Sequence, residues 1–205
     1  MQQQGPARLH HSSREPSSSP SALAGLRQLL WLALLIAASV AFSLGLTCAT
    51  PFAAFGAAAA LTLSRRDALI LILSVWLANQ FVGFTVLGYP WTASTFAWGV
   101  ALGAVAVFAT LAGQWTIRRL AKTARAVSFA ATFSVTFVVY EAVLFAVAVA
   151  LLGGTEDFTG EILGRIFAIN AAAFVGLLTL NRLGASAGFV SEPPIALRMT
   201  VARRA

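Results

Sequence analysis

Charged residues are scarce in this sequence: Asp, Glu, Lys and Arg together make up 10% of its 205 residues. A soluble domain usually carries about 25% charged residues. Hydrophobic residues reach 59% and the mean hydropathy is +0.82. The chain therefore has too few polar side chains to cover a folded surface in water, which predicts that lipid covers part of it.

Cysteine and histidine are also scarce. The single Cys48 excludes an internal disulfide framework and any multi-cysteine metal site. Both histidines, His10 and His11, lie in the polar N-terminal segment, and two adjacent histidines without a third ligand make a weak metal site. The sequence lacks a P-loop, a zinc-protease motif and a Gly-x-Ser-x-Gly nucleophile motif. We therefore expect no metal, no cofactor, no catalytic residues and no ATPase activity in this chain.

Long apolar runs fill the chain from Leu26 to Asn181. A transmembrane helix needs about 20 predominantly apolar residues. Short polar breaks separate six runs, which cover residues 26–46, 51–63, 68–89, 93–115, 126–152 and 161–181. The second run would extend only about 20 Å as a helix. It is either re-entrant or a thin, alanine-rich crossing helix buried among its neighbours.

The basic residues decide between these two alternatives. With six crossings, all loop and tail cations fall on one side: Arg8, Arg14, Arg27, Arg65, Arg66, Arg118, Arg119, Lys122, Arg125, Arg182, Arg198, Arg203 and Arg204. The loops of the other side carry no cation, and Arg165 lies about one turn inside the sixth run. Because cytoplasmic loops are enriched in Lys and Arg, we predict an all-α, polytopic helix bundle. It has six transmembrane helices, lies in the cell (inner) membrane and keeps both termini in the cytoplasm.

The two ends of the chain are predicted to be tails. Residues 1–25 are rich in Gln, Ser, Pro and Arg, contain no apolar run and are expected to be disordered. Residues 26–182 form the six-helix transmembrane domain, and residues 183–205 form a cytoplasmic C-terminal tail. The chain has a net charge of +7, and its basic residues flank the apolar runs. At such positions cations fix the topology and contact anionic headgroups. The expected partner of these cations is the lipid bilayer and not nucleic acid.

Polar side chains inside the third predicted helix are the first candidate ligand contacts. Trp76, Asn79, Gln80 and Gly83 share one helix face. This face offers a ring, amide donors and acceptors, and space for close approach, as a ligand pocket requires. An amide in a membrane bundle also commonly hydrogen-bonds a neighbouring helix. Ligand contact and interhelical packing therefore both remain open for Trp76, Asn79 and Gln80.

Glu141 lies near the centre of the fifth predicted span, where a carboxylate costs about 3 kcal/mol on insertion scales. Protonation, a cationic partner or a polar cavity must offset that cost. Arg165 can pair with Glu161 at i,i+4 spacing, or reach Glu141 if the fifth and sixth helices pack at matching depths. Asn170 lies closer to the middle of the sixth span. We expect Glu141, Arg165 and Asn170 to bind a polar or charged ligand, to relay a proton or to form structural pairs.

Ala33, Ala37 and Ala41 recur every fourth residue on the first predicted helix, and such small-residue rows allow close helix approach. With six spans, internal termini and this alanine row, the chain resembles the substrate-binding (S) components of energy-coupling-factor transporters. The resemblance implies capture of a vitamin or micronutrient from outside the cell. It also implies a separate transmembrane coupling subunit, to which the alanine row docks, and two ATPases. It carries no ligand residues over to this chain.

The sequence thus favours the substrate-capturing subunit of a small-molecule uptake transporter, and not an enzyme. Two alternatives stay open. A membrane scaffold or accessory subunit would use the buried polar residues as interhelical contacts. An intramembrane enzyme would use Glu141 for proton chemistry on a lipid-like substrate, although no second carboxylate within one helix turn and no metal triad accompany it.

Overall fold

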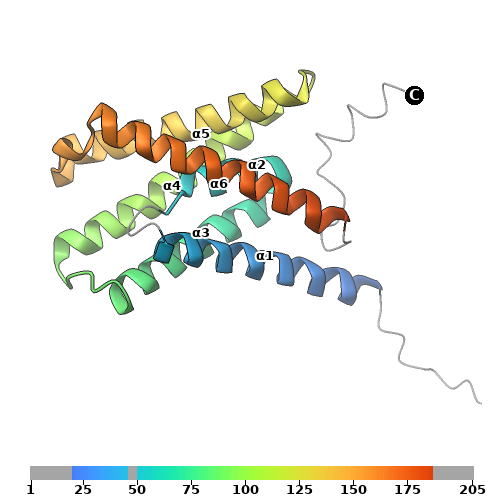
Figure 1. Ribbon diagram of the computed structural model, residues 1–205, viewed down its shortest axis with the longest axis horizontal. Helices are drawn as coiled ribbons and strands as arrows, with labels where there is room; N and C mark the ends of the chain where they lie inside the picture. Colours follow the sequence, from blue (N-terminus) through green and yellow to red (C-terminus); the bar gives the residue numbers. More distant parts are fainter. Residues whose placement is uncertain (1–19, 46–49, 187–205) are drawn as a thin grey trace, which may run out of the picture.

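The computed structural model of the protein describes residues 20–45 and 50–186. Within these two ranges the chain is all-helical and contains no strand, so the predicted all-α class is confirmed. The helices are, in chain order, α1 (Pro20–Gly45), α2 (Phe52–Thr62), α3 (Arg65–Thr85), α4 (Ala93–Arg119), α5 (Arg125–Val147), the π-helix η1 (Ala148–Leu152), the 3-10 helix η2 (Thr155–Asp157) and α6 (Gly160–Ser186). They pack as a bundle of long, roughly aligned rods around the short α2 (Figure 1).

Four helical segments are long and apolar enough to cross a membrane: Arg65–Thr85, Ala93–Arg119, Arg125–Leu151 and Gly160–Ser186. Large apolar side chains on them face outward, among them Leu77, Phe81, Phe108, Val138 and Val175. A soluble protein rarely exposes apolar patches of such extent. The outer surface of the bundle is therefore that of a membrane-embedded protein, as the composition predicts.

The short helix α2 forms the centre of the bundle. It contacts α3, α4, α5 and α6, and every residue from Phe52 to Leu61 is buried. Its sequence, FAAFGAAAALT, consists mostly of small side chains, which let the surrounding helices approach closely. At Gly56 an added Cβ would lie 2.7 Å from Thr110 Oγ1 on α4. The expected thin, alanine-rich helix is thus present and is enclosed by its neighbours.

Local signals set the ends of the long helices. Ser64 and Thr92 precede α3 and α4, and each side-chain oxygen accepts a hydrogen bond from the backbone N–H three residues later, at 3.2 and 3.3 Å. Such hydroxyl caps satisfy amide groups that the first helical turn leaves unpaired. After η1, Gly153 and Gly154 adopt positive φ angles of 75° and 83°, a conformation that only glycine adopts without strain.

Helix termini gather at two opposite ends of the bundle. At one end the ring of Trp31 in α1 packs against Gly184 of α6, and Thr62 of α2 and Leu71 of α3 line the same small space beside Trp31. The start of α1, the start of α5 and the end of α6 lie on this side (Figure 1). We call it the basic end, because it carries the exposed cations Arg65, Arg66, Arg118, Arg119, Lys122, Arg125 and Arg182.

The opposite end, called the cavity end below, holds the α3–α4 loop and the segment between α5 and α6 (Figure 1). The rings of Phe84, Tyr89, Trp91 and Phe96 cluster here, with centroids of contacting pairs 4.8 to 6.1 Å apart. Along α4, Phe96 and Trp115 are separated by about 28 Å at 1.5 Å per residue. Aromatic side chains concentrate at both membrane interfaces, and the hydrocarbon core is about 30 Å thick. The spacing of these two rings therefore matches one bilayer.

Helix bounds differ from the predicted runs mainly by extension. α1 begins at Pro20 and α6 ends at Ser186, so both helices enter segments expected to be tails. α4 continues past Trp115 to Arg119, because cations at a helix C-terminus interact favourably with the helix dipole. The remaining tail residues, together with His10, His11 and Cys48, lie outside the described residues.

Candidate functional site

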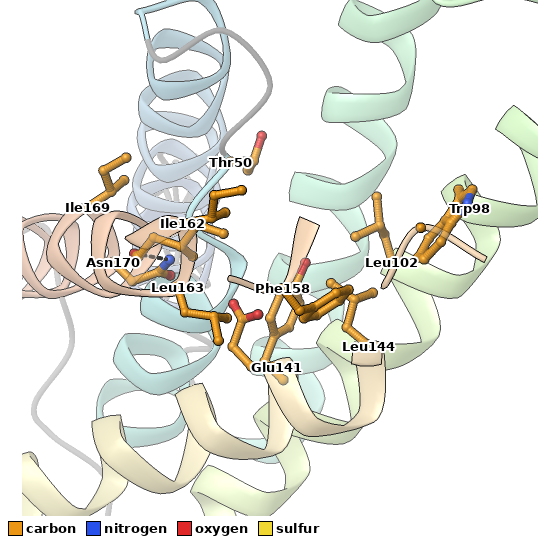
Figure 2. Close-up of a pocket in the computed structure, with 13 residues that line it drawn as sticks. Thr50, Trp98, Leu102, Glu141, Leu144, Phe158, Ile162, Leu163, Ile169 and Asn170 are labelled. Carbon is orange, nitrogen blue, oxygen red and sulfur yellow. Dashed lines mark hydrogen bonds between the residues drawn. The ribbon is translucent and has the colours of Figure 1, made fainter. Parts of the chain in front are cut away.

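A partly open cavity of about 460 Å³ lies between α4, α5, α6 and the residues that lead into α2. Figure 2 shows the side chains around it. The lining residues are Thr50, Trp98, Leu102, Tyr140, Glu141, Leu144, Gly154, Phe158, Ile162, Leu163, Ile166, Ile169 and Asn170. Small-molecule sites are cavities of about 300–1,000 Å³ with mostly apolar walls and a few polar groups. The cavity has the size and the lining of such a site.

The cavity exists because α2 begins deep inside the bundle while its neighbours continue past it. Thr50, two residues before the start of α2, lines the cavity. Tyr140 of α5 also lines it and stacks on Phe52, with ring centroids 6.2 Å apart. Asn170 of α6 accepts a hydrogen bond from the Ala54 N–H at 3.1 Å. The N-terminus of α2 therefore forms the floor of the cavity, and the longer helices form its walls.

Glu141 and Asn170 reach this floor at matching depths. Glu141 lies 11 residues before the end of η1 at Leu152, and Asn170 lies 10 residues after the start of α6 at Gly160. At about 1.5 Å per residue, each lies roughly 15 Å from the cavity end. Both side chains thus lie near the middle of a hydrocarbon layer of about 30 Å.

Glu141 is the one charged side chain among the described lining residues. Only 9% of it is exposed, and its carboxylate is directed into the cavity (Figure 2). Within residues 20–45 and 50–186, no group donates a hydrogen bond to this carboxylate or pairs with it as a cation. A buried charge without a partner is costly, and ionisable groups inside membrane segments mark ligand and ion sites. Glu141 is therefore the centre of the candidate site.

Asn170 combines a structural role with a place in the lining. Its Oδ1 accepts from the Ala54 N–H, and its Nδ2 donates to the Ile166 carbonyl oxygen at 3.0 Å. Because the amide nitrogen has two hydrogens, one of them is not used by the Ile166 bond. Asn170 fixes the start of α2 against α6 and also presents an amide edge near Glu141.

The candidates on α3 do not line the cavity. The Trp76 indole nitrogen donates to the Gly99 carbonyl oxygen at 2.7 Å, and its ring covers Gly103, where an added Cβ would lie 2.7 Å away. The Gln80 amide packs against Gly99 in the same way. The two glycines of α4 thus receive the polar face of α3. In the structure Trp76 and Gln80 make interhelical contacts.

Asn79 lies next to the site without entering it. It is 7% exposed, and its Oδ1 accepts a hydrogen bond from the Thr50 hydroxyl. This bond joins α3 to the cavity-lining segment before α2. Asn79 therefore positions Thr50 and does not itself belong to the lining.

Arg165 also lies away from the cavity. It is not among the lining residues, although Ile162, Ile166 and Ile169 of the same helix are. Its side chain is exposed. In the described part of the chain it pairs neither with Glu141 nor with Glu161. The structure thus brings Glu141 and Asn170 together and leaves Arg165 outside.

The alanine row of α1 faces outward. Trp31 and Leu35 are buried on the inner face of this helix, whereas Ala33, Ala37 and Ala41 are exposed. At about 100° per residue, the row lies on the opposite face from the buried pair. This surface is therefore open to lipid or to another protein.

Most of the lining residues could not be identified from the sequence; only Glu141 and Asn170 were candidates. Trp98 and Phe158 carry no signal that separates a residue facing a cavity from one facing lipid. One signal was available on α6: Ile162, Ile166 and Asn170 recur at four-residue spacing, which places an amide on the same face as bulky apolar side chains.

No protein-family model, curated protein or solved structure matches this chain.

Proposed function

We propose that this protein is the substrate-capturing subunit of a small-molecule uptake transporter in the cell membrane. The observation that carries the proposal is the mid-depth cavity, whose apolar and aromatic walls surround a carboxylate that has no partner among the described residues. Binding sites typically combine such walls with a few convergent polar groups. A vitamin or micronutrient is the substrate class implied by the resemblance to S components.

The distribution of charge supports an outward-facing cavity. Seven exposed cations lie at the basic end and only Arg165, among the described residues, lies toward the other end, while the cavity reaches toward that opposite end, where Gly154 and Phe158 line it. Because cytoplasmic segments carry the excess of Lys and Arg, the basic end is cytoplasmic in this proposal. The chain crosses the membrane six times, with α2 as a short crossing, and both termini are in the cytoplasm.

The transporter in this proposal needs further subunits. The chain contains no ATP-binding motif, so a coupling subunit and ATPases supply the energy. The coupling subunit docks on the exposed row of Ala33, Ala37 and Ala41, where small side chains permit close helix contact.

Native mass spectrometry of the protein purified in mild detergent tests the capture function. We expect wild-type protein to release a small molecule and Leu163→Trp protein to release none, because the larger side chain fills the space beside Glu141. Leu183→Trp is the matched control, since Leu183 is exposed on the same helix and lies outside the lining. Equal occupancy of Leu163→Trp and wild type would contradict capture in this cavity.

Cysteine labelling tests the orientation. In a Cys48→Ser background, Thr155→Cys places a thiol at the cavity end and Thr123→Cys places one at the basic end; both positions are exposed. A membrane-impermeant maleimide added to intact cells is expected to label Thr155→Cys only, and to label Thr123→Cys after lysis. The reverse pattern would refute the outward-facing cavity.

A membrane scaffold or accessory subunit is the second candidate. It is favoured by the contacts of Trp76 and Gln80, which join α3 to α4, and of Asn79, which joins α3 to the segment before α2. This alternative predicts that purified protein releases no small molecule. It also predicts that Glu141→Gln alters stability without altering uptake.

A further inference from the structure

We infer that the compound held in this cavity carries a positively charged nitrogen and that Glu141 is its counter-ion. The inference rests on the proposed capture function and deepens it. It names the chemical group that the site recognises and the side chain that recognises it.

The described lining of the cavity carries one charged side chain, Glu141. Glu141 is 9% exposed, and the other described lining residues are apolar, aromatic or uncharged polar. No described cation pairs with its carboxylate; Arg165 of α6 is exposed and is not among the lining residues. Burial of a carboxylate is offset when an opposite charge with good geometry accompanies it. An ammonium group on the ligand supplies that charge.

Asn170 and Thr50, two other polar residues near the floor, already make hydrogen bonds within the protein. The Asn170 oxygen accepts from the Ala54 N–H, and its amide nitrogen donates to the Ile166 carbonyl. The Thr50 hydroxyl donates to Asn79. The strongest acceptor that the cavity offers to a ligand is therefore the Glu141 carboxylate, whose oxygens accept hydrogen bonds from N–H donors.

The walls of the cavity are partly aromatic. Trp98, Tyr140 and Phe158 all line the same cavity as Glu141. Aromatic faces attract cations through the ring quadrupole, most strongly where water is excluded. Carboxylate and rings together therefore favour a cation over a neutral group of equal size.

The N-terminus of α2 in the floor acts in the other direction, but it is weaker. A helix N-terminus is equivalent to about half a positive charge, whereas an ionised carboxylate carries a full negative one. Three of the first four amide groups of α2 are already bonded: Phe52 to the Thr50 carbonyl, Ala54 to the Asn170 side chain and Phe55 to the Pro51 carbonyl. The floor therefore keeps a net negative potential, which disfavours an anionic ligand.

The same carboxyl group could instead be protonated and donate a hydrogen bond to a neutral ligand. Glu141→Gln separates these cases, because the amide keeps the shape and a donor but removes the charge. Glu141→Asp is the control that keeps the charge. The ammonium itself can come from a water-soluble compound or from the headgroup of an aminolipid.

The experiment uses three probes of similar size that differ in charge: 2-phenylethylamine, 2-phenylethanol and phenylacetate. Binding is measured by saturation-transfer NMR on the full chain in nanodiscs of phosphatidylglycerol, which contains no amine. We expect wild-type protein to bind the amine at least tenfold more tightly than the alcohol or the acid, a difference of about 1.4 kcal/mol. We expect Glu141→Gln to abolish this preference, and Glu141→Asp and Arg165→Ala to retain it.

Several outcomes are decisive. Equal binding of the three probes, or a preference for the amine that survives in Glu141→Gln, would overturn the counter-ion role and leave the capture function standing. Failure of every probe to bind, together with an empty cavity in native mass spectrometry, would remove the capture function as well. Circular dichroism of each variant establishes that the bundle is folded.

A further arm identifies the source of the ammonium. The measurement is repeated in nanodiscs that contain phosphatidylethanolamine. Displacement of the amine probe assigns the natural ligand to the bilayer, and undiminished binding assigns it to a water-soluble compound. Both results keep Glu141 as the counter-ion.

Discussion

Replacing Gly56 by alanine tests the packing of α2, on which the floor of the cavity depends. The added Cβ would lie 2.7 Å from Thr110 Oγ1 and 3.4 Å from Thr136 Cγ2. Thr110 is fully buried, and its hydroxyl is held by the Ala106 carbonyl at 2.8 Å, so it has no open space to enter. Overpacking of this kind costs about 1–3 kcal/mol. A change from glycine to alanine otherwise favours a helix by about 1 kcal/mol. We therefore expect Gly56→Ala to lower the free energy of unfolding by roughly 0–2 kcal/mol.

Gly176→Ala on α6 is the matched control for this substitution. No atom lies within 4 Å of the added Cβ at position 176, so only the change in helix propensity acts there. The two alanine variants should therefore differ by about 1–3 kcal/mol in free energy of unfolding. Unfolding is measured by SDS titration in micelles, followed by far-UV circular dichroism.

Thr110→Ala supplies the second half of the test, because it removes the oxygen that the new Cβ would meet. In the Thr110→Ala background, Gly56→Ala should lower the free energy of unfolding only slightly. The double-mutant cycle should therefore show a coupling of at least about 1 kcal/mol between the two positions. If Gly56→Ala and Gly176→Ala shift stability equally in the wild-type background, α2 does not pack on α4 at Gly56, and the described floor of the cavity is wrong.

Three further substitutions have definite expected outcomes. Asn170→Leu leaves the buried Ala54 N–H unpaired and should lower the free energy of unfolding by about 1–3 kcal/mol in the same SDS titration. An unchanged midpoint would contradict the role of Asn170 in fixing the start of α2 against α6. Trp76→Phe removes the hydrogen bond to Gly99 and should cost about 0.5–1.5 kcal/mol without changing the molecule retained in native mass spectrometry. Ala37→Leu, on the exposed face of α1, should abolish co-purification with a coupling subunit and leave ligand retention intact; loss of both would place the alanine row inside the fold.

The long helices were predictable from the sequence because insertion into lipid depends on hydropathy summed over about 20 residues. That sum does not depend on which helices become neighbours. It identified the runs that became α3, α4, α5 and α6, and the alanine content of residues 51–63 indicated the buried α2. Helix ends were less predictable, because caps such as Ser64 extend a helix by a few residues beyond the apolar run.

The candidate site was only partly predictable. Glu141 and Asn170 stand out because a polar side chain in an apolar run needs a physical reason. Trp98 and Ile166 do not stand out, because lipid and a ligand cavity accept the same apolar side chains. Trp76 was a candidate because it shares a helix face with Asn79 and Gln80. Its indole N–H instead donates to a backbone carbonyl of α4, and the spacing of residues along one helix does not show which neighbouring helix it will contact.

The shortness of α2 has an electrical consequence in a membrane-spanning bundle. When water occupies the cavity, solution from the cavity end extends to the level of Phe52, and a plug of about 16 Å of packed helix separates it from the basic end. The transmembrane voltage then falls mainly across that plug, where moving one elementary charge is worth about 2.3 kcal/mol per 100 mV. In a membrane, the close-packed alanines of α2 would thereby act as the insulator between the two sides of the protein.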